Sequence, residues 1–342
     1  MLNFHLRNKN LVAVVVMILF ILTLASISYL QKLTGPMDRN SVSSYEVEVK
    51  AGASSSQIAN LLFKKGLIRH PFLFKALVRF RGVEDNLQAG YYRLSTGMSI
   101  GVIIDKLVNN EVITYQVTIP EGYTVEEIGS KLAKEAEFSK EQFLAVAEEL
   151  KAEFSFAEKI NVKKRKYPLE GYLFPETYSI PKGTTPENII KIMVRQFKEK
   201  LNDKLLIEVK QSKYSLDEIM TIASLVEAEV KYGKERRLIA GVIHNRLAKN
   251  MLLQIDATIQ YILPEHEKQI LYEDLTLESP YNTYQNLGLP PGPINNPGLT
   301  SIKAALNPAQ TDYLYYFALD DGSHKFSETY KEHLRLQNKL KY

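Results

Sequence analysis

An apolar run near the N-terminus constrains this chain of 342 residues more than any other feature. Residues 11–30 contain only three polar side chains, those of Thr23, Ser26 and Ser28. At about 1.5 Å per residue, a helix of this length matches the roughly 30 Å hydrocarbon core of a bilayer. Because a cleavable signal peptide has a shorter apolar core, the run predicts an uncleaved transmembrane helix.

The charges beside this run predict its orientation. Arg7 and Lys9 precede it, and the first 30 residues contain no acidic residue. The positive-inside rule therefore places residues 1–10 in the cytoplasm, as a short tail, and the rest of the chain outside. Lys32 and Arg39 weaken this asymmetry from the other end. We expect a single-pass cell-membrane protein with an extracytoplasmic globular part.

The composition excludes several classes of protein. The formal net charge is +4, but residues after position 30 hold 41 basic against 39 acidic side chains, which excludes a nucleic-acid-binding surface. The absence of cysteine from the sequence excludes thiolate metal sites, a catalytic cysteine and disulfides. The roughly 300 residues beyond the predicted membrane helix are typical of two domains.

A short repeat follows a polar linker predicted for residues 31–44. Its three copies are Gly52-x-Ser54-x3-Ile58-x3-Leu62, Gly97-x-Ser99-x3-Ile103-x3-Leu107 and Gly122-x-Thr124-x3-Ile128-x3-Leu132. Each copy follows an alternating stretch, in residues 45–50, 89–94 and 115–119, which predicts a strand, a glycine turn, a Ser or Thr N-cap and a buried helix. These β-turn-α units resemble LysM-type glycan-binding modules, and we assign residues 45–137 to such a module. A supersecondary repeat without a ligand is the equally weighted alternative.

Glu227 is the candidate general acid. Ser215 and Glu218 form an S-x-x-E capping box, and apolar residues at helical spacing then run through Val230. Glu227 lies on the flank of that stripe, where loss of water raises the pKa of a carboxyl group and suits it to proton transfer. Glu229 lies two positions on and points to roughly the opposite side, so the pair cannot form a catalytic dyad. A structural ion pair is the simpler alternative for Glu227.

Several motifs in fixed order indicate a family. They are Leu169-Glu-Gly-Tyr-Leu-Phe-Pro-Glu-Thr-Tyr178, Val226-Glu-Ala-Glu229, Asn245-Arg-Leu247, Leu253-Gln-Ile-Asp-Ala-Thr258, Tyr281-Asn-Thr-Tyr284 and Gly288-Leu-Pro-Pro-Gly-Pro-Ile294. Over residues 45–335 the chain resembles the endolytic murein transglycosylases, the YceG-like family of bacterial cell-wall enzymes. Ala257 departs from the pattern, because family members often have proline there. If Asp256 caps a helix, proline at 257 would only pre-organise its first turn.

The stretch from Ser279 to Thr300 is unsuited to regular structure. It holds five prolines, three glycines and four asparagines. Long irregular loops in compact domains are usually functional or disordered, and the apolar and aromatic residues here argue against disorder. We expect a rigid wall of a binding cleft.

The resemblance implies a fold, a reaction and a set of residues. It implies an α+β chain with a single transmembrane helix, the LysM-like module and a mixed α+β catalytic domain in residues 138–342. The reaction cleaves the β-1,4 bond after N-acetylmuramic acid, with the sugar's C6 hydroxyl attacking C1 to leave a 1,6-anhydro end. One carboxyl group is enough for this reaction, whereas hydrolytic glycosidases need two. We assign Glu227 as acid and then base, and predict no cofactor and no metal.

Substrate contacts are expected from side chains in the same motifs. Amides could bind acetamido groups or ring hydroxyls, carboxylates could shape the cleft, and tyrosine rings could serve as sugar platforms or as core. The predicted substrate-binding residues are Glu170, Tyr172, Asn245, Gln254, Asp256, Tyr281, Asn282 and Tyr284. For Arg246 an ion pair with Glu229 is at least as good an interpretation as a substrate contact. The expected partners are peptidoglycan glycan strands, the cytoplasmic membrane and, as a candidate, peptidoglycan synthases, with strand length in cell-wall synthesis as the process affected.

Two other functions fit the same residues. One is a non-catalytic, membrane-anchored scaffold that binds glycan through the glycine repeats. The other is a peptidoglycan hydrolase in which Glu170 or Asp256 supplies the second carboxylate. The three hypotheses differ in product, which would be an anhydro end, no product at all, or a reducing end.

Overall fold

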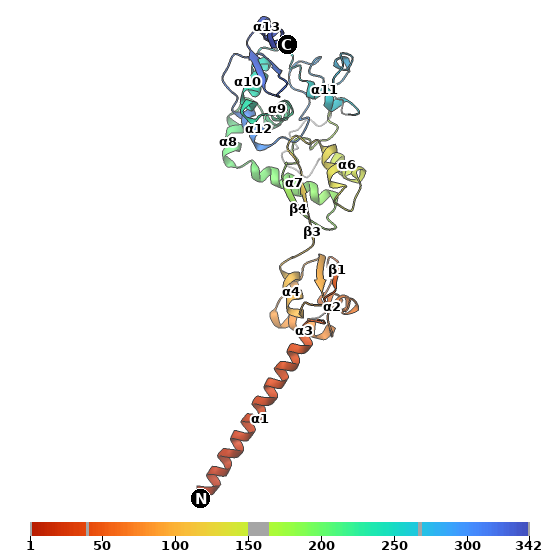
Figure 1. Cartoon of the computed structure of the whole chain (residues 1–342), viewed down its shortest axis with the longest axis vertical. Coiled ribbons are helices and arrows are strands. Elements are labelled where there is room, and N and C mark those ends of the chain that lie inside the picture. The colour runs from red at the N-terminus through yellow and green to blue at the C-terminus, as the bar shows by residue number, and fades with distance from the viewer. Residues whose placement is uncertain (1, 39–40, 150–163, 266–268, 341–342) are drawn as a thin grey trace. The chain divides into compact units, whose positions relative to one another are not determined.

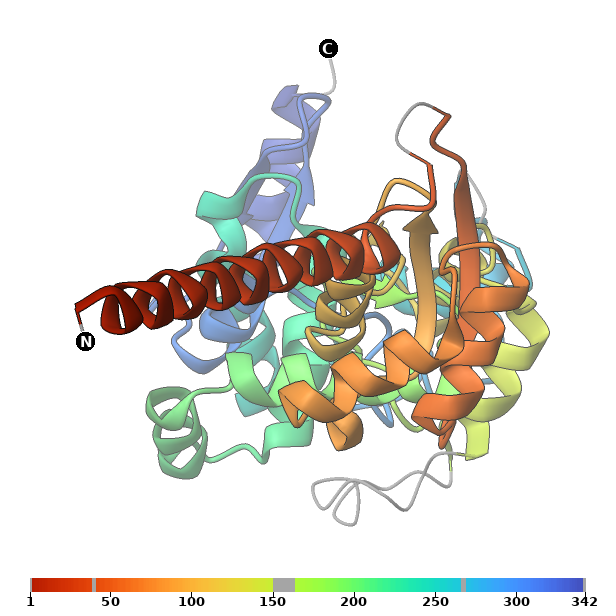
Figure 2. The same ribbon diagram turned by 90° about the horizontal axis from the view of Figure 1, so that it is seen from below.

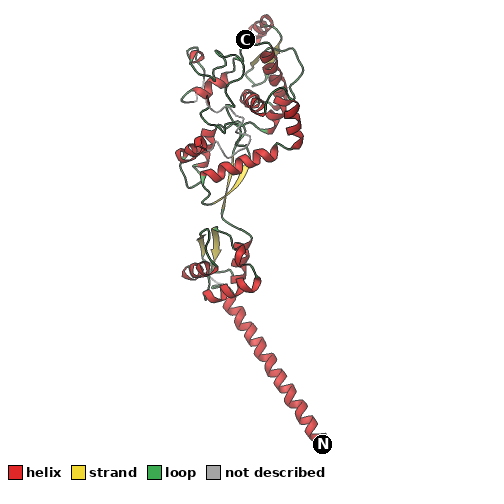
Figure 3. Ribbon diagram, turned by 180° about the vertical axis from the view of Figure 1, so that it is seen from behind, coloured by secondary structure: helices red, strands yellow, loops and turns green. Residues whose placement is uncertain are grey.

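The structure is a computed structural model that describes residues 2–38, 41–149, 164–265 and 269–340 (Figure 1). The chain forms two compact units, one of Met1–Tyr115 with Pro181–Gly183 and the other of Gln116–Ile180 with Thr184–Tyr342. Helices dominate the described residues (Figure 3), in which β1 (Ser44–Val49) pairs with β2 (Gly90–Ser95), β3 (Thr114–Thr118) with β4 (Thr177–Pro181), and β5 (Tyr315–Ala318) with β6 (His324–Ser327). The mixed α+β class expected from the sequence is therefore confirmed.

Helix α1 spans Leu2–Thr34 and contains one apolar segment, Val14–Thr34, long enough to cross a membrane. Within that segment the hydroxyl groups of Thr23 and Ser26 donate to the carbonyls of Phe20 and Leu22, at 2.7 and 2.8 Å. These bonds within the helix satisfy the two hydroxyl groups, as a membrane-spanning helix would require. The helix continues through residues 31–34, which the sequence assigned to a linker. The predicted linker therefore overlaps the end of α1 by these four residues, because the first residues that oppose helix in this stretch are Gly35 and Pro36.

The first unit places two helices between two antiparallel strands. Its elements are β1 (Ser44–Val49), α2 (Ser55–Lys64), α3 (Pro71–Arg81), η1 (Glu84–Asn86), β2 (Gly90–Ser95) and α4 (Ile100–Val108). Val47 lies opposite Tyr92 in the β1–β2 ladder, and both side chains are buried in the core. Ser54 and Ser99 cap α2 and α4, as the repeat predicted.

The second unit is mainly helical. It contains most of β3 (Thr114–Thr118) and β4 (Thr177–Pro181), then α5 (Val125–Leu132), α6 (Lys140–Glu149), α7 (Pro186–Lys200), α8 (Asp203–Gln211), α9 (Leu216–Glu229), η4 (Gly233–Glu235), α10 (Arg236–Ala248), α11 (Asp256–Ile262), η5 (Asp274–Thr276), α12 (Leu299–Leu306), β5 (Tyr315–Ala318), β6 (His324–Ser327) and α13 (Tyr330–Leu340). Helix α9 packs against α10, α11 and α12. These contacts position the site described below.

The third copy of the repeat lies in this second unit. Thr124 caps α5 through a capping box with Glu127, as the repeat predicts for its cap. Helix α5 packs on α6, and the Val125 N–H donates to the Glu170 carboxylate. The compact first unit thus ends at Tyr115, whereas the predicted module extends to residue 137. Glycan binding by the first unit remains a prediction.

Candidate active site

Helix α9 is the scaffold of the site. Ser215 and Glu218 cap it reciprocally, so the predicted capping box is confirmed. Every residue from Ile219 to Val226 is buried. Ser224 is small enough to let a loop approach, and its hydroxyl accepts from the Ile294 N–H at 3.1 Å while its carbonyl accepts from the Asn295 amide at 3.0 Å. The helix is therefore fixed on all sides before it reaches Glu227.

Glu227 is held through both carboxylate oxygens. Its side chain is 7% exposed. Oε1 accepts from Nη2 of Arg236 at 3.0 Å, and Oε2 accepts from the backbone N–H of Gly298 at 3.0 Å. Arg236 is itself oriented by a hydrogen bond from Nε to the Ser301 hydroxyl at 2.9 Å. One carboxyl group is thus held by two other segments of the chain, the start of α10 and the loop that leads into residues 299–306, which is the preorganisation that proton transfer requires.

A second carboxylate shares the same arginine. Oε2 of Glu121 lies 3.8 Å from Nη2 of Arg236. Burial raises the pKa of Glu121, the negative charge of Glu227 raises it further, and Arg236 opposes both effects. The two carboxylates therefore belong to one electrostatic cluster around a single guanidinium.

Two glycines make this cluster possible. A Cβ on Gly298 would occupy the space of the Glu121 carboxylate, so only glycine allows its N–H to approach Glu227 beside Glu121. Gly122 has φ +80°, a left-handed conformation that L side chains rarely adopt, and a Cβ there would lie 3.6 Å from Cγ of Glu227. The cluster is assembled by backbone as well as by side chains.

Glu229 faces a different environment, as helical geometry predicted. Its carboxylate accepts from the Tyr316 hydroxyl at 2.9 Å, and burial raises its pKa. The ion pair considered for Arg246 is not among the ion pairs of the described residues. The Arg246 guanidinium donates instead to the carbonyls of Leu314 and Leu253, at 2.6 and 2.7 Å. Arg246 is thus a structural residue that joins α10 to two backbone segments.

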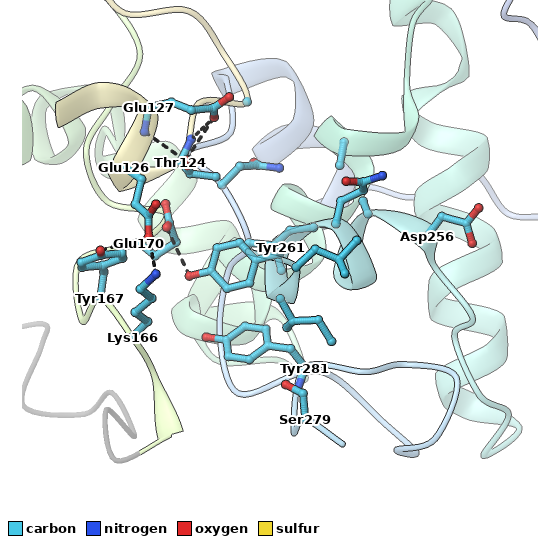
Figure 4. A pocket seen from close by; sticks show the side chains of 18 of the residues that line it. Thr124, Glu126, Glu127, Lys166, Tyr167, Glu170, Asp256, Tyr261, Ser279 and Tyr281 are labelled. Carbon is cyan, nitrogen blue, oxygen red and sulfur yellow. Dashed lines mark hydrogen bonds and ion pairs between the residues drawn. The ribbon is translucent and has the colours of Figure 1, made fainter. Parts of the chain in front are cut away.

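The second unit contains a cavity of about 1220 Å³, part of whose lining is shown in Figure 4. Among its lining residues, Ala228 follows Glu227 in sequence, and a Cβ on Gly122 would lie 3.6 Å from Cγ of Glu227, so the cavity extends to the neighbours of Glu227. Much of the lining is polar or aromatic, with Thr124, Glu126, Lys166, Glu170, Asp256, Tyr261 and Tyr281 among the contributing residues. A cavity with this lining offers hydrogen-bond partners and rings to a polar, ring-containing ligand.

Glu170 is a buried residue that lines this cavity. Its carboxyl group accepts from the Val125 N–H at 3.1 Å, from the Asn296 amide at 3.0 Å and from the Tyr261 hydroxyl at 3.3 Å. Burial raises its pKa to about 8, against the lowering effect of the hydrogen bonds from Val125 and Tyr261. Figure 4 shows the bond to Tyr261, whose ring lies 5.0 Å from that of Tyr281. Of the predicted residues, Glu170 and Tyr281 are thus brought together at one cavity.

Asp256 also lines the cavity, but it does not cap a helix. Helix α11 begins at Asp256, and its N-cap is Ile255, which makes no side-chain cap bond. The Asp256 carboxylate instead accepts from the hydroxyl of Tyr284. The cap prediction was therefore wrong, because a tyrosine from the following loop binds this carboxylate.

The other predicted substrate contacts have structural partners. The Tyr172 hydroxyl donates to Asp217 at 2.7 Å within the core, and the Asn282 amide donates to the carbonyls of Leu275 and Leu277. The Asn245 amide donates to two backbone carbonyls at 2.7 and 3.0 Å. Gln254 is exposed, with φ +48°, and does not line the cavity described above. We therefore assign packing or turn roles to these four residues.

The proline-rich loop forms part of the cavity wall. Ser279, Tyr281 and Asn295 are among the lining residues that it contributes. Asn296 fixes the loop by accepting from the Leu173 N–H at 2.8 Å and by donating to the Tyr123 carbonyl at 2.9 Å. The loop thus lines a cavity, and its role as the wall of a binding cleft remains a prediction. Among the described residues, no group of three or more His, Cys, Asp or Glu side chains could hold a metal ion.

Comparison with known proteins assigns the chain to a family. The sequence matches the YceG-like family over residues 47–339. The chain belongs to the YceG-like family. It is similar to the endolytic murein transglycosylase of Bacillus subtilis, with 38% identity over 321 residues that cover 91% of this chain and 89% of that protein. It is also similar to the endolytic murein transglycosylase of Streptococcus pneumoniae D39, with 33% identity over 88% of this chain and 59% of that protein.

A solved structure agrees with this assignment. The crystal structure of a YceG-like protein from Listeria monocytogenes matches with a TM-score of 0.60 and 37% identity, covering 86% of this chain and 100% of that one. The resemblance identified from sequence motifs is therefore confirmed.

In this YceG-like chain, sequence reasoning missed Glu121, Arg236 and the N–H of Gly298. Glu121 follows a predicted strand and precedes the third repeat, where an acidic residue resembles an ordinary turn. Arg236 stands in the charged run Lys234-Glu-Arg-Arg237, which is typical of a solvated surface. A usable signal was Gly298 within Asn296-Pro-Gly298, because a glycine in a rigid loop often marks a close approach.

Proposed function

We propose that this protein is a membrane-anchored endolytic murein transglycosylase. The observation that carries the proposal is the buried Glu227 carboxyl group, held by Arg236 and Gly298 beside a large polar cavity. Membership of a family whose members in Bacillus subtilis and Streptococcus pneumoniae are named endolytic murein transglycosylases gives the reaction. The substrate is the glycan strand of peptidoglycan, and the product carries a 1,6-anhydro end.

The reaction needs one group that first gives and then takes a proton. Glu227 gives its proton to the oxygen that leaves C1 of N-acetylmuramic acid as the β-1,4 bond breaks. The sugar's C6 hydroxyl oxygen bonds to C1, and its proton returns to Glu227. No water is consumed, and the intramolecular attack benefits from proximity. Two fixed hydrogen bonds to Glu227 keep the acceptor of that proton in place.

The surrounding cavity supports a polysaccharide substrate. Tyr261 and Tyr281 provide adjacent rings, and the carboxyl groups of Glu170 and Asp256 can accept from hydroxyl or acetamido groups. Both carboxyl groups already bind a tyrosine hydroxyl, which orients them. We assign Glu170, Asp256, Tyr261 and Tyr281 to substrate binding.

A two-carboxylate hydrolase is a second candidate, with Glu121 as the partner. Oε1 of Glu227 and Oε2 of Glu121 lie at most 6.8 Å apart, the sum of their 3.0 and 3.8 Å distances from Nη2 of Arg236. Hydrolases of both stereochemical types use separations of roughly 5 to 9.5 Å. However, the Arg236 guanidinium contacts both carboxylates and so lies between them. A hydrolase would need that space for the sugar carbon or for the attacking water. This observation favours the single-carboxylate reaction.

Anchoring and glycan binding complete the proposal. Helix α1 inserts in the cytoplasmic membrane with the chain after residue 44 outside, which protease treatment of spheroplasts would test by degrading the globular part. The order β1, α2, α3, β2 in the first unit supports the assignment, because LysM modules have a βααβ arrangement. Glycan affinity of the full chain should fall when this module is deleted; unchanged affinity would make the module purely structural.

The central test of the site is a substitution of Glu227. Glu227→Gln retains the shape of the side chain and removes its proton. We expect release of anhydro products from uncrosslinked strands to be lost, and undiminished release would remove Glu227 from the mechanism.

A further inference from the structure

Helix α3 has a composition unlike that of the other helices in the first unit. Residues 69–81 read Arg-His-Pro-Phe-Leu-Phe-Lys-Ala-Leu-Val-Arg-Phe-Arg, with four basic residues, three phenylalanines and no acidic residue. Basic and aromatic residues in one short helix are typical of segments that lie in a membrane interface.

The aromatic residues of α3 divide between two faces. Phe74 and Val78 are fully buried in the core of the unit. Phe72 and Phe80 are 70% and 88% exposed. They lie eight residues apart with the exposed Ala76 between them, so the three form one stripe at i, i+4 and i+8. The exposed Lys75 and Arg79 flank this stripe. Two large apolar side chains on one exposed stripe imply a partner.

The start of α3 is fastened to the end of α1 (Figures 1 and 2). The Arg69 guanidinium donates to the carbonyls of Lys32 and Gly35, at 3.3 and 3.0 Å, and to those of Pro36 and Met37, at 2.8 and 3.1 Å. Four carbonyls at one helix end thus bind one side chain that precedes Pro71 by two residues. This arrangement fixes where α3 begins relative to α1.

The segment that follows α1 is also tied to the unit. The Asp38 N–H donates to the Thr96 carbonyl at 3.1 Å, and the Ser43 N–H donates to the Thr96 hydroxyl at 2.9 Å. The unit is therefore bonded to the chain within a few residues of the end of α1.

The length of the apolar part of α1 indicates where these contacts lie relative to the bilayer. Its 21 residues, Val14–Thr34, match the roughly 30 Å core of a bilayer at about 1.5 Å per residue. The carbonyls bound by Arg69 then lie at the membrane interface. Phe72 is only three residues after Arg69, so the exposed stripe also begins near the membrane interface.

We propose that the Phe72–Ala76–Phe80 stripe of α3 lies in the headgroup region of a phospholipid bilayer containing anionic lipid, with Lys75 and Arg79 against the lipid phosphates. The inference rests on the proposed insertion of α1 and is independent of the catalytic proposal. It gives the first unit a second membrane contact, which holds it against the surface from which α1 emerges.

The sequence supplies a clean experiment because it contains no tryptophan. Single-tryptophan variants of the full-length protein, Phe72→Trp and Phe80→Trp, would be reconstituted in vesicles of mixed phosphatidylglycerol and phosphatidylcholine with brominated acyl chains. Phe20→Trp within α1 serves as the inserted reference. Tyr272→Trp, at a side chain that is 91% exposed in the second unit, serves as the water reference. Each substitution replaces an exposed ring with a ring, so folding should be preserved.

The proposal predicts a specific pattern of quenching. Phe72→Trp and Phe80→Trp should emit at shorter wavelength than Tyr272→Trp and should be quenched by bromines near the headgroups more than by bromines deep in the chains. Phe20→Trp should show the opposite depth preference. Water-like, unquenched emission from both α3 reporters beside a quenched Phe20→Trp would overturn the proposal and leave the anchor intact.

Two further outcomes separate the alternatives. Unquenched Phe20→Trp would overturn the anchor and the surface contact together. Short-wavelength emission from α3 without lipid quenching would indicate a protein on the stripe and overturn the lipid assignment.

Lys75→Glu with Arg79→Glu should weaken quenching of the Phe80→Trp reporter, and unchanged quenching would exclude the role of anionic lipid. Activity on soluble glycan fragments should be the same in all reporters, since catalysis is not involved.

Discussion

Glu227 and Arg236 are nine residues apart in sequence, and Nη2 of Arg236 lies 3.0 Å from Oε1 of Glu227. The connection between α9 and α10 turns the chain so that the last turn of one helix meets the first residue of the next. Arg236 also lies 3.8 Å from Glu121, so one guanidinium contacts both the buried Glu227 carboxylate and the half-exposed Glu121 carboxylate.

Glu227→Gln should reduce anhydro-product formation by about 100-fold to 10,000-fold, the usual contribution of general acid catalysis. The amide can still accept from Arg236, so the fold should survive, and thermal unfolding would verify this. Glu199→Gln is a matched control, because Glu199 is exposed on α7. Glu229→Gln should lose far less activity than Glu227→Gln, since Glu229 lines the cavity and binds Tyr316 but makes none of the contacts with Arg236 and Gly298 that hold Glu227. Equal losses at 227 and 229 would contradict the assignment.

Glu121→Gln should shift the pH profile of kcat/KM. Burial and the negative charge of Glu227 raise the pKa of Glu121, so its charge appears beside Arg236 at a higher pH than for an ordinary carboxyl group, and Glu121→Gln should remove this ionisation from the profile. A purely structural role would lower activity equally at every pH. The profile, measured against that of Glu199→Gln, distinguishes the two.

Gly298→Ala should impair activity through a steric effect. The new Cβ would fall on the Glu121 carboxylate, and either that group or the N–H bound to Glu227 must move. Loss of a hydrogen bond to a charged group is worth about 1.5 to 3 kcal/mol, so we expect at least about a tenfold loss of kcat. Adding Glu121→Ala should relieve the clash and raise the melting temperature of the single variant. A double variant no more stable than Gly298→Ala would show that the clash is not the cause.

Glu170 should make stability depend on pH. Its pKa of about 8 exceeds the ordinary value of 4.5, so the native state keeps a proton that the unfolded chain releases between these values. Its contribution to stability is therefore complete below about pH 4.5 and decreases by up to about 1.4 kcal/mol per pH unit as the pH rises toward 8. Glu170→Gln mimics the protonated form and should gain stability relative to the parent from about pH 5 to about pH 8. Parallel unfolding curves across this range would contradict the buried, protonated Glu170.

Local sequence signals predicted the elements better than their contacts. The capping boxes at Ser215 and Thr124 were predictable because cap and N3 residues are neighbours in sequence. The Arg236 and Glu121 contacts with Glu227 were not, because they join segments whose approach depends on the packing of α9, α10 and α12. Asp256 was misread for the same reason, since a tyrosine 28 residues later binds its carboxylate.

Family motifs identified regions of the site more reliably than individual contacts. Glu170, Asp256 and Tyr281 line the cavity, whereas Tyr172 and Asn282 from the same motifs bind other parts of the protein. A motif identifies a residue of the family, but it does not say whether a tyrosine or an asparagine packs in the core or lines the cavity. Only the three-dimensional positions of their partners separate the two roles.

The mass of the new glycan ends tests the account most directly. Purified full-length protein would be incubated with uncrosslinked glycan strands, and the products would be weighed alongside those of Glu227→Gln. An intramolecular attack leaves anhydro ends, each lighter than a reducing end by one water. We expect anhydro ends from the parent protein and none from the variant. Reducing ends from the parent protein would contradict the single-carboxylate mechanism and identify a hydrolase that uses a second carboxylate.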